Sequence, residues 1–243
     1  MWNKIQRIYV WTTKVRPMDY LYFIANTAGS TITLSKTWSP TAVTIETSTD
    51  GSTRSTYTFG TTITLSSAWS KVYFRNTSPT PTWFSTNSSN VYTFSMTWSI
   101  AARGDINFLL CKKSTTTIIG NACFLYLFQN CTALTSCPSL PATTLTQSCY
   151  ASMFRWCTNL TTLPNLPALT WQQGCYQNMF RECSKIKMSY SQTWDYQTEY
   201  RIPTTWTWVT ATNATSSMFY QTGWTYTSNP TVNTTYYTSN TLV

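Results

Sequence analysis

The sequence predicts a mainly β protein with short helices, in which an N-terminal β-sandwich is followed by a short repeat solenoid. Three observations lead to this fold class. Charged residues are only 9% of the chain, against roughly 25% in ordinary globular proteins, and Thr and Ser take their place. Short alternating apolar segments fill the first half. A pattern with a period of 26 residues then runs through 123–188.

The chain divides into three parts by composition and pattern. They are an N-terminal anchor segment (1–18), a β-sandwich domain (19–110) and a repeat domain with a C-terminal cap (111–243). The anchor is short and basic, and Ile5, Ile8 and Val10 suggest one strand that Pro17 ends. Short basic termini often become ordered only on a partner, so this segment is the predicted attachment point.

The β-sandwich is predicted from successive short strands with turn signals between them. The segments are 31–36, 41–47, 56–59, 61–67, 71–76 and 91–97. Alternation is clear in Ile32/Leu34 and Phe94/Met96, and Asp50-Gly51 marks a turn. This regular spacing is typical of a sandwich of about seven strands.

Each repeat is predicted to hold a short helix followed by a bent strand. Cys149, Met153, Phe154 and Cys157 fall at i, i+4, i+5 and i+8, which is one face of a helix. Leucines then recur every three residues from Leu160, as in the strand and turn of a leucine-rich repeat. A degenerate fourth copy, ATSSMFYQTG, occupies 214–223. The predicted repeat core consists of Cys123, Phe128, Cys131, Leu134, Cys137, Cys149, Met153, Phe154, Cys157, Leu160, Leu163, Cys175, Met179, Phe180, Cys183 and Ile186.

The unit CYxxMFxxCTxLTxLPxLP resembles the BspA-like leucine-rich repeats of gut and oral bacterial surface proteins and of phages that infect such bacteria. The resemblance covers 120–190 well and 214–223 weakly. The segment RIYVWTTKVRP is similar to the start of many phage tail and fibre proteins, which usually have Gly where this chain has Trp11. Together the two resemblances imply a virion surface component, and the repeats themselves are scaffolds for binding.

Seven of the eight cysteines lie in the repeats and are predicted to fill the core as free thiols. On a helix Cys149 and Cys157 would lie about 12 Å apart, beyond the roughly 7 Å limit between the Cα atoms of a disulfide. The chain has no His and no CxxC pair, so the usual zinc spacings are missing. Cys137 occupies the slot of Leu163, which favours core packing over a disulfide and a disulfide over a metal. The role of Cys111, outside the repeats, stays open.

The chain has 12 Trp and only 7 Gly, and many Trp stand where a turn favours Gly. These positions are Trp38, Trp69, Trp83, Trp206 and Trp208, with Trp156 at a Gly position of the resembled repeat. Two interpretations stay open. The indoles are exposed stacking platforms for sugars, or the sequence was translated with a codon table that reads a glycine codon, UGA being the suspect, as Trp. We hypothesise that several are glycine. Trp171 aligns with Leu145 and suits an apolar role.

No catalytic site is predicted. His, the commonest general base, is absent, and the seven acids are dispersed. Asp195 and Glu199 are close in sequence, and a glycosidase needs two carboxylates, but they fall in an insertion where solvated charge is the favoured role. Arg103-Gly104-Asp105 is interpreted as a plain turn. We therefore expect no enzyme activity, no cofactor and no metal.

The net charge of +9 comes from scattered residues, so nucleic-acid binding is not expected. The sequence begins without a secretory signal and has no apolar run of about 18 residues, which favours a soluble chain that reaches the virion surface within a particle. The predicted function is a non-enzymatic bacteriophage virion structural protein (fibre, tail or capsid decoration) presenting a host-surface or glycan-binding module. The alternatives are a bacterial cell-surface adhesin and, less favoured, a polysaccharide depolymerase. The predicted partners are other virion proteins, further copies of the chain (a trimer is favoured) and a host glycan.

Overall fold

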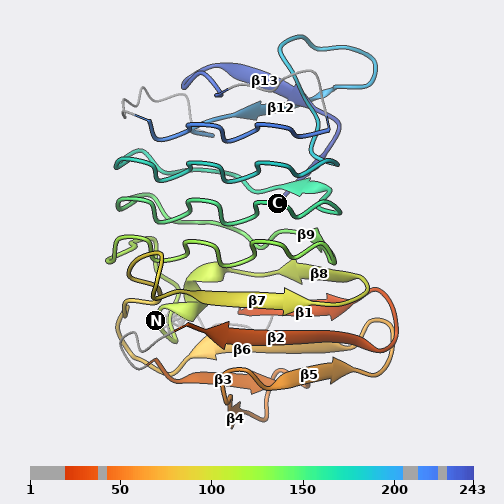
Figure 1. Cartoon of the computed structure of the whole chain (residues 1–243), viewed down its shortest axis with the longest axis vertical. Coiled ribbons are helices and arrows are strands. Elements are labelled where there is room, and N and C mark those ends of the chain that lie inside the picture. The colour runs from red at the N-terminus through yellow and green to blue at the C-terminus, as the bar shows by residue number, and fades with distance from the viewer. Residues whose placement is uncertain (1–19, 38–42, 205–212, 224–228) are drawn as a thin grey trace, which may run out of the picture.

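The protein is mainly β, as the sequence predicts. The structure, a computed structural model, describes residues 20–37, 43–204, 213–223 and 229–243. The described strands form sheets of six, three, three and two strands, and none closes on itself. Figure 1 shows the strand-rich first half at one end of the long axis and the repeats stacked above it. Within the described ranges the only helix is the short 3-10 helix η2 (Ile106–Leu109).

Two sheets make up the first half of the chain. Its strands are β1 (Leu21–Ala25), β2 (Ser30–Lys36), β3 (Ile45–Ser48), β4 (Ser55–Thr56), β5 (Thr62–Leu65), β6 (Lys71–Asn76), β7 (Tyr92–Met96) and β8 (Ile100–Arg103). One sheet has the order β4-β3-β6-β1-β8-β9, in which β9 is Leu134–Ser136, and the other has the order β5-β2-β7. Each predicted segment overlaps a strand, although 56–59 shares only Thr56 with β4, and β1 and β8 are not predicted. β1 is apolar on both faces, because Tyr22 and Ile24 alternate with buried Leu21, Phe23 and Ala25, so it lacks the expected alternation.

The inner faces of the two sheets share one core. Phe23 of β1 and Phe74 of β6 pack against Phe94 of β7, with ring centroids 4.9 and 5.3 Å away. This core continues into the repeats without a break. Strand β9 (Leu134–Ser136) of the first repeat also pairs in parallel with β8. The position where the sequence divides the two domains is therefore bridged by both a sheet and a core.

The prediction of short helices in the repeats is wrong. The segment 148–157 is a series of turns in which Ser148, Ser152 and Trp156 have φ of 54°, 52° and 64°. A left-handed residue at every fourth position cannot belong to an α-helix. Every second amide bonds to the neighbouring copy, as Phe154 N does to Met179 O at 3.0 Å, and the amides between them bond locally, as Met153 N does to Tyr150 O at 3.2 Å. Pairing between copies and local turns thus replace the bonds that a helix would make within itself.

Hydrogen bonds between copies join the first repeat to the degenerate fourth. Phe128 N donates to Met153 O at 2.9 Å, and Phe180 N donates to Met218 O at 2.9 Å. Each of these bonds has the same direction along the stack, from the earlier copy to the carbonyl of the later one. On the other side of the first copy, Phe94 N of β7 donates to Leu127 O at 2.7 Å. The three-stranded sheet of the first half therefore supplies the layer on which the first repeat lies.

A column of parallel phenyl rings runs along this stack. It comprises Phe94, Phe128, Phe154, Phe180 and Phe219, with successive centroids 5.2, 5.4, 5.5 and 5.5 Å apart and interplanar angles of 2–9°. All five side chains are buried. One aromatic contact pattern therefore links β7 to every repeat, so the layers are expected to unfold together.

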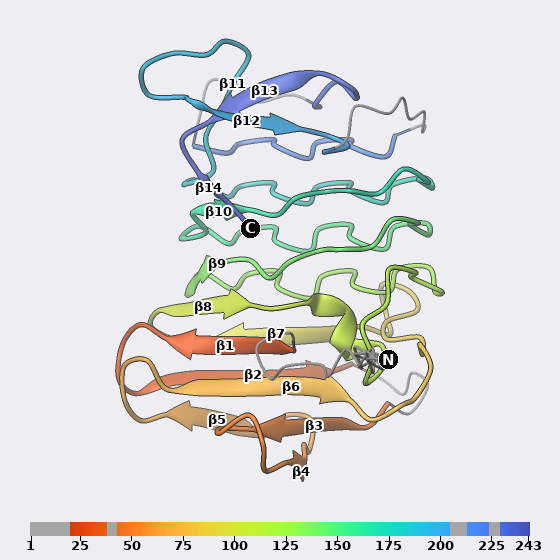
Figure 2. The ribbon, with the colours of Figure 1, turned by 180° about the vertical axis from the view of Figure 1, so that it is seen from behind.

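The C-terminal tail is split between two places. The later strands are β10 (Thr162–Leu163), β11 (Met188–Ser189), β12 (Thr198–Arg201), β13 (Thr235–Thr238) and β14 (Thr241–Leu242). β13 joins β11 and β12 at the end of the stack, where the sequence predicts a cap. β14 turns back and pairs in parallel with β10 of the second repeat. Figure 2 shows the C-terminus beside β10 rather than at the end of the molecule.

The side chain of Asn240 connects the tail to two repeats. It accepts from Lys187 N at 2.7 Å and donates to Thr161 O at 3.0 Å and to Lys185 O at 2.9 Å. Only 7% of Asn240 is exposed, so water cannot readily replace these bonds.

Asn240→Ala is expected to lower the free energy of unfolding by about 2 kcal/mol, because it removes three hydrogen bonds made by a buried side chain and leaves one backbone donor and two backbone acceptors without their partner. Urea denaturation measures the change. Ser239→Ala, next to it in the chain, is the control and should alter stability by no more than about 0.5 kcal/mol. An unchanged urea midpoint in Asn240→Ala would contradict this role.

Candidate binding pockets

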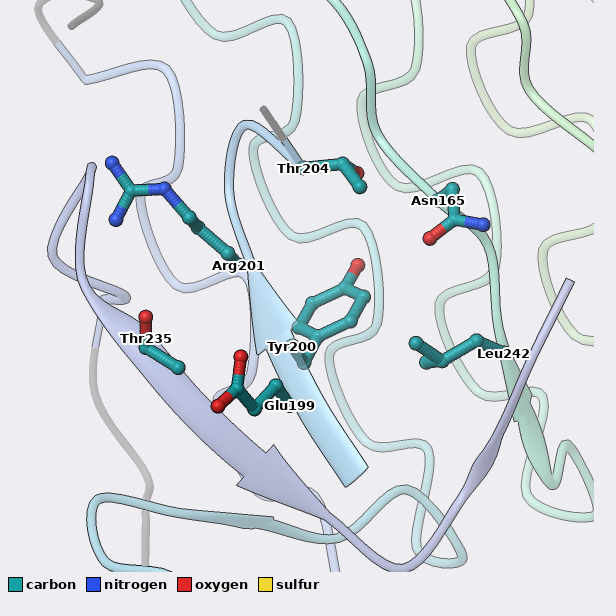
Figure 3. Close-up of a pocket in the computed structure, with 7 residues that line it drawn as sticks. All are labelled: Asn165, Glu199, Tyr200, Arg201, Thr204, Thr235 and Leu242. Carbon is teal, nitrogen blue, oxygen red and sulfur yellow. The ribbon is translucent and has the colours of Figure 1, made fainter. Parts of the chain in front are cut away.

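Two hollows lined by polar side chains lie toward opposite ends of the described structure. The first, the junction pocket, has a volume of about 130 Å³ and lies where β12 and β13 meet the second repeat and the tail. Figure 3 shows its lining of Asn165, Glu199, Tyr200, Arg201, Thr204, Thr235 and Leu242.

Hydrogen bonds hold the walls of the junction pocket in place. Tyr200 donates its hydroxyl to Pro164 O at 3.2 Å, and Leu166 N donates to Thr204 Oγ at 2.9 Å. Arg201 donates to Asn233 O. The Glu199 carboxylate is exposed and lies near Thr235. These oxygens and amides suit hydroxyl ligands, but the volume is below the roughly 300 Å³ of typical ligand pockets and accommodates only part of a sugar ring.

The acid pair considered in the sequence does not meet in this pocket. Glu199 lines it from β12, whereas Asp195 lies in the preceding turn, where Thr193 and Tyr196 form a bridge, and is not part of the lining. Glu199 is the one acidic residue among the lining residues. General acid–base hydrolysis of a glycoside would require a second carboxyl group across the bound sugar.

The second hollow, the hairpin pocket, has a volume of about 350 Å³. It lies where the β3–β4 hairpin, at one end of the six-stranded sheet, faces the edge strand β5 of the other sheet. Its lining is Thr47, Ser48, Thr49, Asp50, Thr53, Arg54, Ser55, Ile63 and Val72. In Figures 1 and 2 these strands form the end of the molecule opposite β12 and β13.

Asp50 shapes the hairpin turn rather than offering a free charge. Its Oδ1 accepts from Ser52 N and Thr53 N, each at 2.7 Å, and from Ser48 Oγ at 2.8 Å. These bonds, led by the one from Ser52 N, hold the pKa of Asp50 well below its usual range. Arg54 is thereby presented at the end of a fixed turn.

Arg54 has no acidic partner within hydrogen-bonding distance in the described chain. Its Nη2 donates to Gly51 O at 3.3 Å, and Nη1 is buried with no hydrogen bond. Its guanidinium lies over the ring of Tyr20 at 4.5 Å. Arg75 lies over the same ring at 5.3 Å but is paired with Glu46 at 3.0 Å. Burial, and then the charge of Arg75, lower the pKa of Arg54.

The residues predicted to form the repeat core are all buried. Cys123, Phe128, Cys131, Leu134, Cys137, Cys149, Met153, Phe154, Cys157, Leu160, Leu163, Cys175, Met179, Phe180, Cys183 and Ile186 have at most 1% of their surface exposed. The predicted anchor residues Ile5, Ile8 and Val10 lie outside the described residues. The sequence does not single out Arg54 or the rest of the hairpin pocket. The only signal there is the Asp50-Gly51 turn that precedes this basic residue.

All eight cysteines are buried free thiols. Three of them donate to the carbonyl of a phenylalanine in the layer beneath: Cys131 to Phe94 O, Cys157 to Phe128 O and Cys183 to Phe154 O, at 3.0, 3.0 and 2.9 Å. Cys111 donates to Lys113 O at 3.1 Å. The described residues contain no cluster of three or more His, Cys, Asp or Glu that could hold a metal ion. The thiols thus combine core packing with bonds between layers.

Burial raises the pKa of every one of these thiols, to about 12 for Cys123, Cys131, Cys137 and Cys175. Because the unfolded chain loses thiol protons at a lower pH than the folded one, stability is full below about pH 9 and falls as the pH rises toward 12. Urea denaturation at pH 8 and pH 10 should show this loss. In the native protein at pH 8 the thiols should resist Ellman's reagent, and after denaturation all eight should react. Rapid labelling of the native protein would contradict this.

Three tryptophans in the described ranges have left-handed backbone. Trp69, Trp98 and Trp156 have φ of 68°, 65° and 64°, a region that favours glycine. The first two indoles are 75% and 72% exposed. Trp98 is not among the positions that the sequence singles out, although the short gap between Met96 and Ile100 could have marked a turn. Trp171, in contrast, is buried and donates its indole N–H to Ala168 O at 2.7 Å. Trp38, Trp206 and Trp208 lie outside the described residues.

Among the described helices, none has the length and hydrophobicity needed to cross a membrane. Comparisons with protein-family models, with curated proteins and with solved structures find no match for this chain.

Proposed function

We propose that the chain is a non-enzymatic structural protein of a bacteriophage virion, serving as a fibre, tail or capsid-decoration protein at the particle surface. The observation that carries the proposal is the unbroken column of phenyl rings from Phe94 to Phe219, with its hydrogen-bonded layers. A display protein must hold its binding surface at a fixed distance from its attachment point, and a close-packed column resists bending.

The proposed architecture is an N-terminal β-sandwich on which a short leucine-rich-repeat solenoid is stacked. Repeats of this kind complete their core only against a neighbour, which agrees with the backbone bonds from Phe154 to Met179 and from Phe180 to Met218. The rest of the surface presents Thr and Ser hydroxyls and two polar pockets. Such a surface suits a host glycan as the ligand of the displayed module.

Co-purification with phage particles tests the proposal. We expect the protein to band with intact particles in a density gradient, at a copy number that is a multiple of three if the favoured trimer forms. Recovery from bacterial cell envelopes and not from particles would assign the protein to a bacterial surface adhesin. New reducing ends after incubation with capsule extract would assign it to a depolymerase.

The anchor segment provides a second test. Removing residues 1–17 should abolish incorporation into particles while leaving thermal unfolding of the isolated protein unchanged, because the proposed contact is with another virion protein. A truncated chain that is still incorporated would overturn the assignment of Ile5, Ile8 and Val10 to the anchor.

A further inference from the structure

We infer that the hairpin pocket binds a sugar that carries a carboxylate, such as a uronic acid unit of an acidic host polysaccharide. This inference rests on the proposed glycan-binding role and names the class of sugar. The main observation is that Arg54 lines the pocket and that its guanidinium has no acidic partner within 4 Å in the described chain. A cation in this state attracts an anion, because burial has removed part of its water while Gly51 O and the ring of Tyr20, both uncharged, are its contacts and Nη1 has no hydrogen bond.

The charges around Arg54 favour a carboxylate at its guanidinium. Arg75 stands over the same tyrosine ring, and its partner Glu46 is already engaged through Nε and Nη2, each at 3.0 Å. The carboxylate of Asp50 is occupied by the hairpin's own donors. Arg54 is thus the cation with spare donors in this pocket, and a guanidinium with free N–H groups prefers the planar, two-oxygen geometry of a carboxylate.

The rest of the lining suits a sugar ring. Thr47, Thr49 and Ser55 line the pocket, and their hydroxyls make no hydrogen bond to other described residues. Ile63 is partly exposed and adds an apolar surface, backed by the buried Val72, on which the C–H face of a pyranose can lie. The volume of about 350 Å³ exceeds that of the junction pocket and falls within the range of small-molecule sites. Hydroxyl groups beside one cation and an apolar patch match a sugar acid better than a simple anion.

Titration calorimetry on the full chain, with glucuronate and glucose as probes, tests the inference. These sugars differ at C6, where glucuronate has a carboxylate and glucose a hydroxymethyl group. We expect glucuronate to bind at least about tenfold more tightly, since a charged hydrogen bond contributes at least that factor. The preference should shrink as salt is raised. Equal binding of the two sugars, or binding of neither, would overturn the inference.

Matched variants assign the binding to this pocket. Arg54→Gln should lower glucuronate affinity at least about tenfold, to the level of glucose. Lys112→Gln removes one charge from an exposed site outside the pocket lining and should change affinity less than about twofold. Thr49→Val keeps the charge and removes one free hydroxyl, so it should lower the affinity for both sugars severalfold. It tests the assignment if Arg54→Gln does not fold. Wild-type affinity in Arg54→Gln, or in Thr49→Val, would overturn the assignment.

Two further probes separate the sugar from other carboxylates. Acetate should bind more weakly than glucuronate, and equal affinity would show a simple anion site and overturn the inference. A glutamate-rich peptide that bound more tightly than glucuronate would assign the pocket to a protein partner instead. These results are independent of particle co-purification, so failure of the sugar site and failure of the virion role are distinguishable.

Discussion

Replacing Trp69, Trp98 and Trp156 together by glycine is expected to raise the free energy of unfolding by about 2 kcal/mol. Left-handed backbone costs a residue with a side chain about 1–2 kcal/mol, and the greater freedom of glycine in the unfolded chain returns part of that gain. Trp156 should contribute least, since the guanidinium of Arg155 lies 3.8 Å from its ring. Urea denaturation of the triple variant measures the sum.

Trp171→Gly is the matched control, because it makes the same chemical change at a buried indole with a satisfied N–H. This variant should have a free energy of unfolding about 3–5 kcal/mol lower than the parent chain, as is usual when a large core side chain is deleted. A gain in stability in the triple variant and a loss in Trp171→Gly would distinguish turn positions from a core tryptophan. A triple variant less stable than the parent chain would show that the three indoles are native and stabilising.

The same three positions test which genetic code translates this gene. If UGA encodes glycine in the natural host, peptides of protein purified from that source will carry glycine at Trp69, Trp98 and Trp156, and the three codons will be UGA. Trp171 should be encoded by UGG. Tryptophan at all three positions in the natural protein would exclude this hypothesis. Glycine there would also remove the exposed indoles as stacking platforms for a glycan.

Phe154→Ala is expected to lower the free energy of unfolding by about 3–5 kcal/mol. Its ring stacks on Phe128 at 5.4 Å and on Phe180 at 5.5 Å, so truncation opens a cavity in the middle of the column. Because one core joins the first half to the repeats, fluorescence and thiol exposure should report a single transition at a lower urea midpoint.

The control for Phe154→Ala is Leu169→Ala in the same repeat. Leu169 is 41% exposed, so its truncation should cost no more than about 1 kcal/mol. A similar loss in both variants would contradict the column as the source of stability. Separate transitions in the parent protein would show that the layers are not coupled.

The hydrophobic pattern predicted which residues are buried more securely than it predicted their backbone. Cys149, Met153, Phe154 and Cys157 are buried, as one face of a helix would be, yet the segment is a series of turns. Spacing along a sequence reports which side chains face the core. It does not distinguish a helix from a ribbon with left-handed residues at every fourth position, because both bring these positions to one side.

Strands with polar outer faces, such as β2 and β7, were predictable from alternation, whereas β1 was not. Tyr22 stacks on Tyr73 at 5.2 Å on the outer face of the six-stranded sheet, so that face carries aromatic rings and the alternation disappears. Neither pocket could be predicted from local sequence patterns, because each is lined by residues that are far apart in the sequence. The junction pocket depends on Asn165, Glu199 and Leu242, and the hairpin pocket joins Arg54 to Ile63 of a different sheet.

The sequence by itself determined the period of the repeats, the equivalence of Cys137 and Leu163, the core role of the cysteines and the unusual placement of the tryptophans. The first three of these depend on comparing one position with its counterpart 26 residues away, and the tryptophans stand out because a turn favours Gly at their positions. Only the tertiary structure decided that the repeats pair through turns, that β14 returns to β10 and that Arg54 has no acidic partner among the described residues. The physical reason is that backbone pairing and charge compensation between distant segments depend on which groups meet in space. Local periodicity in the sequence does not specify those contacts.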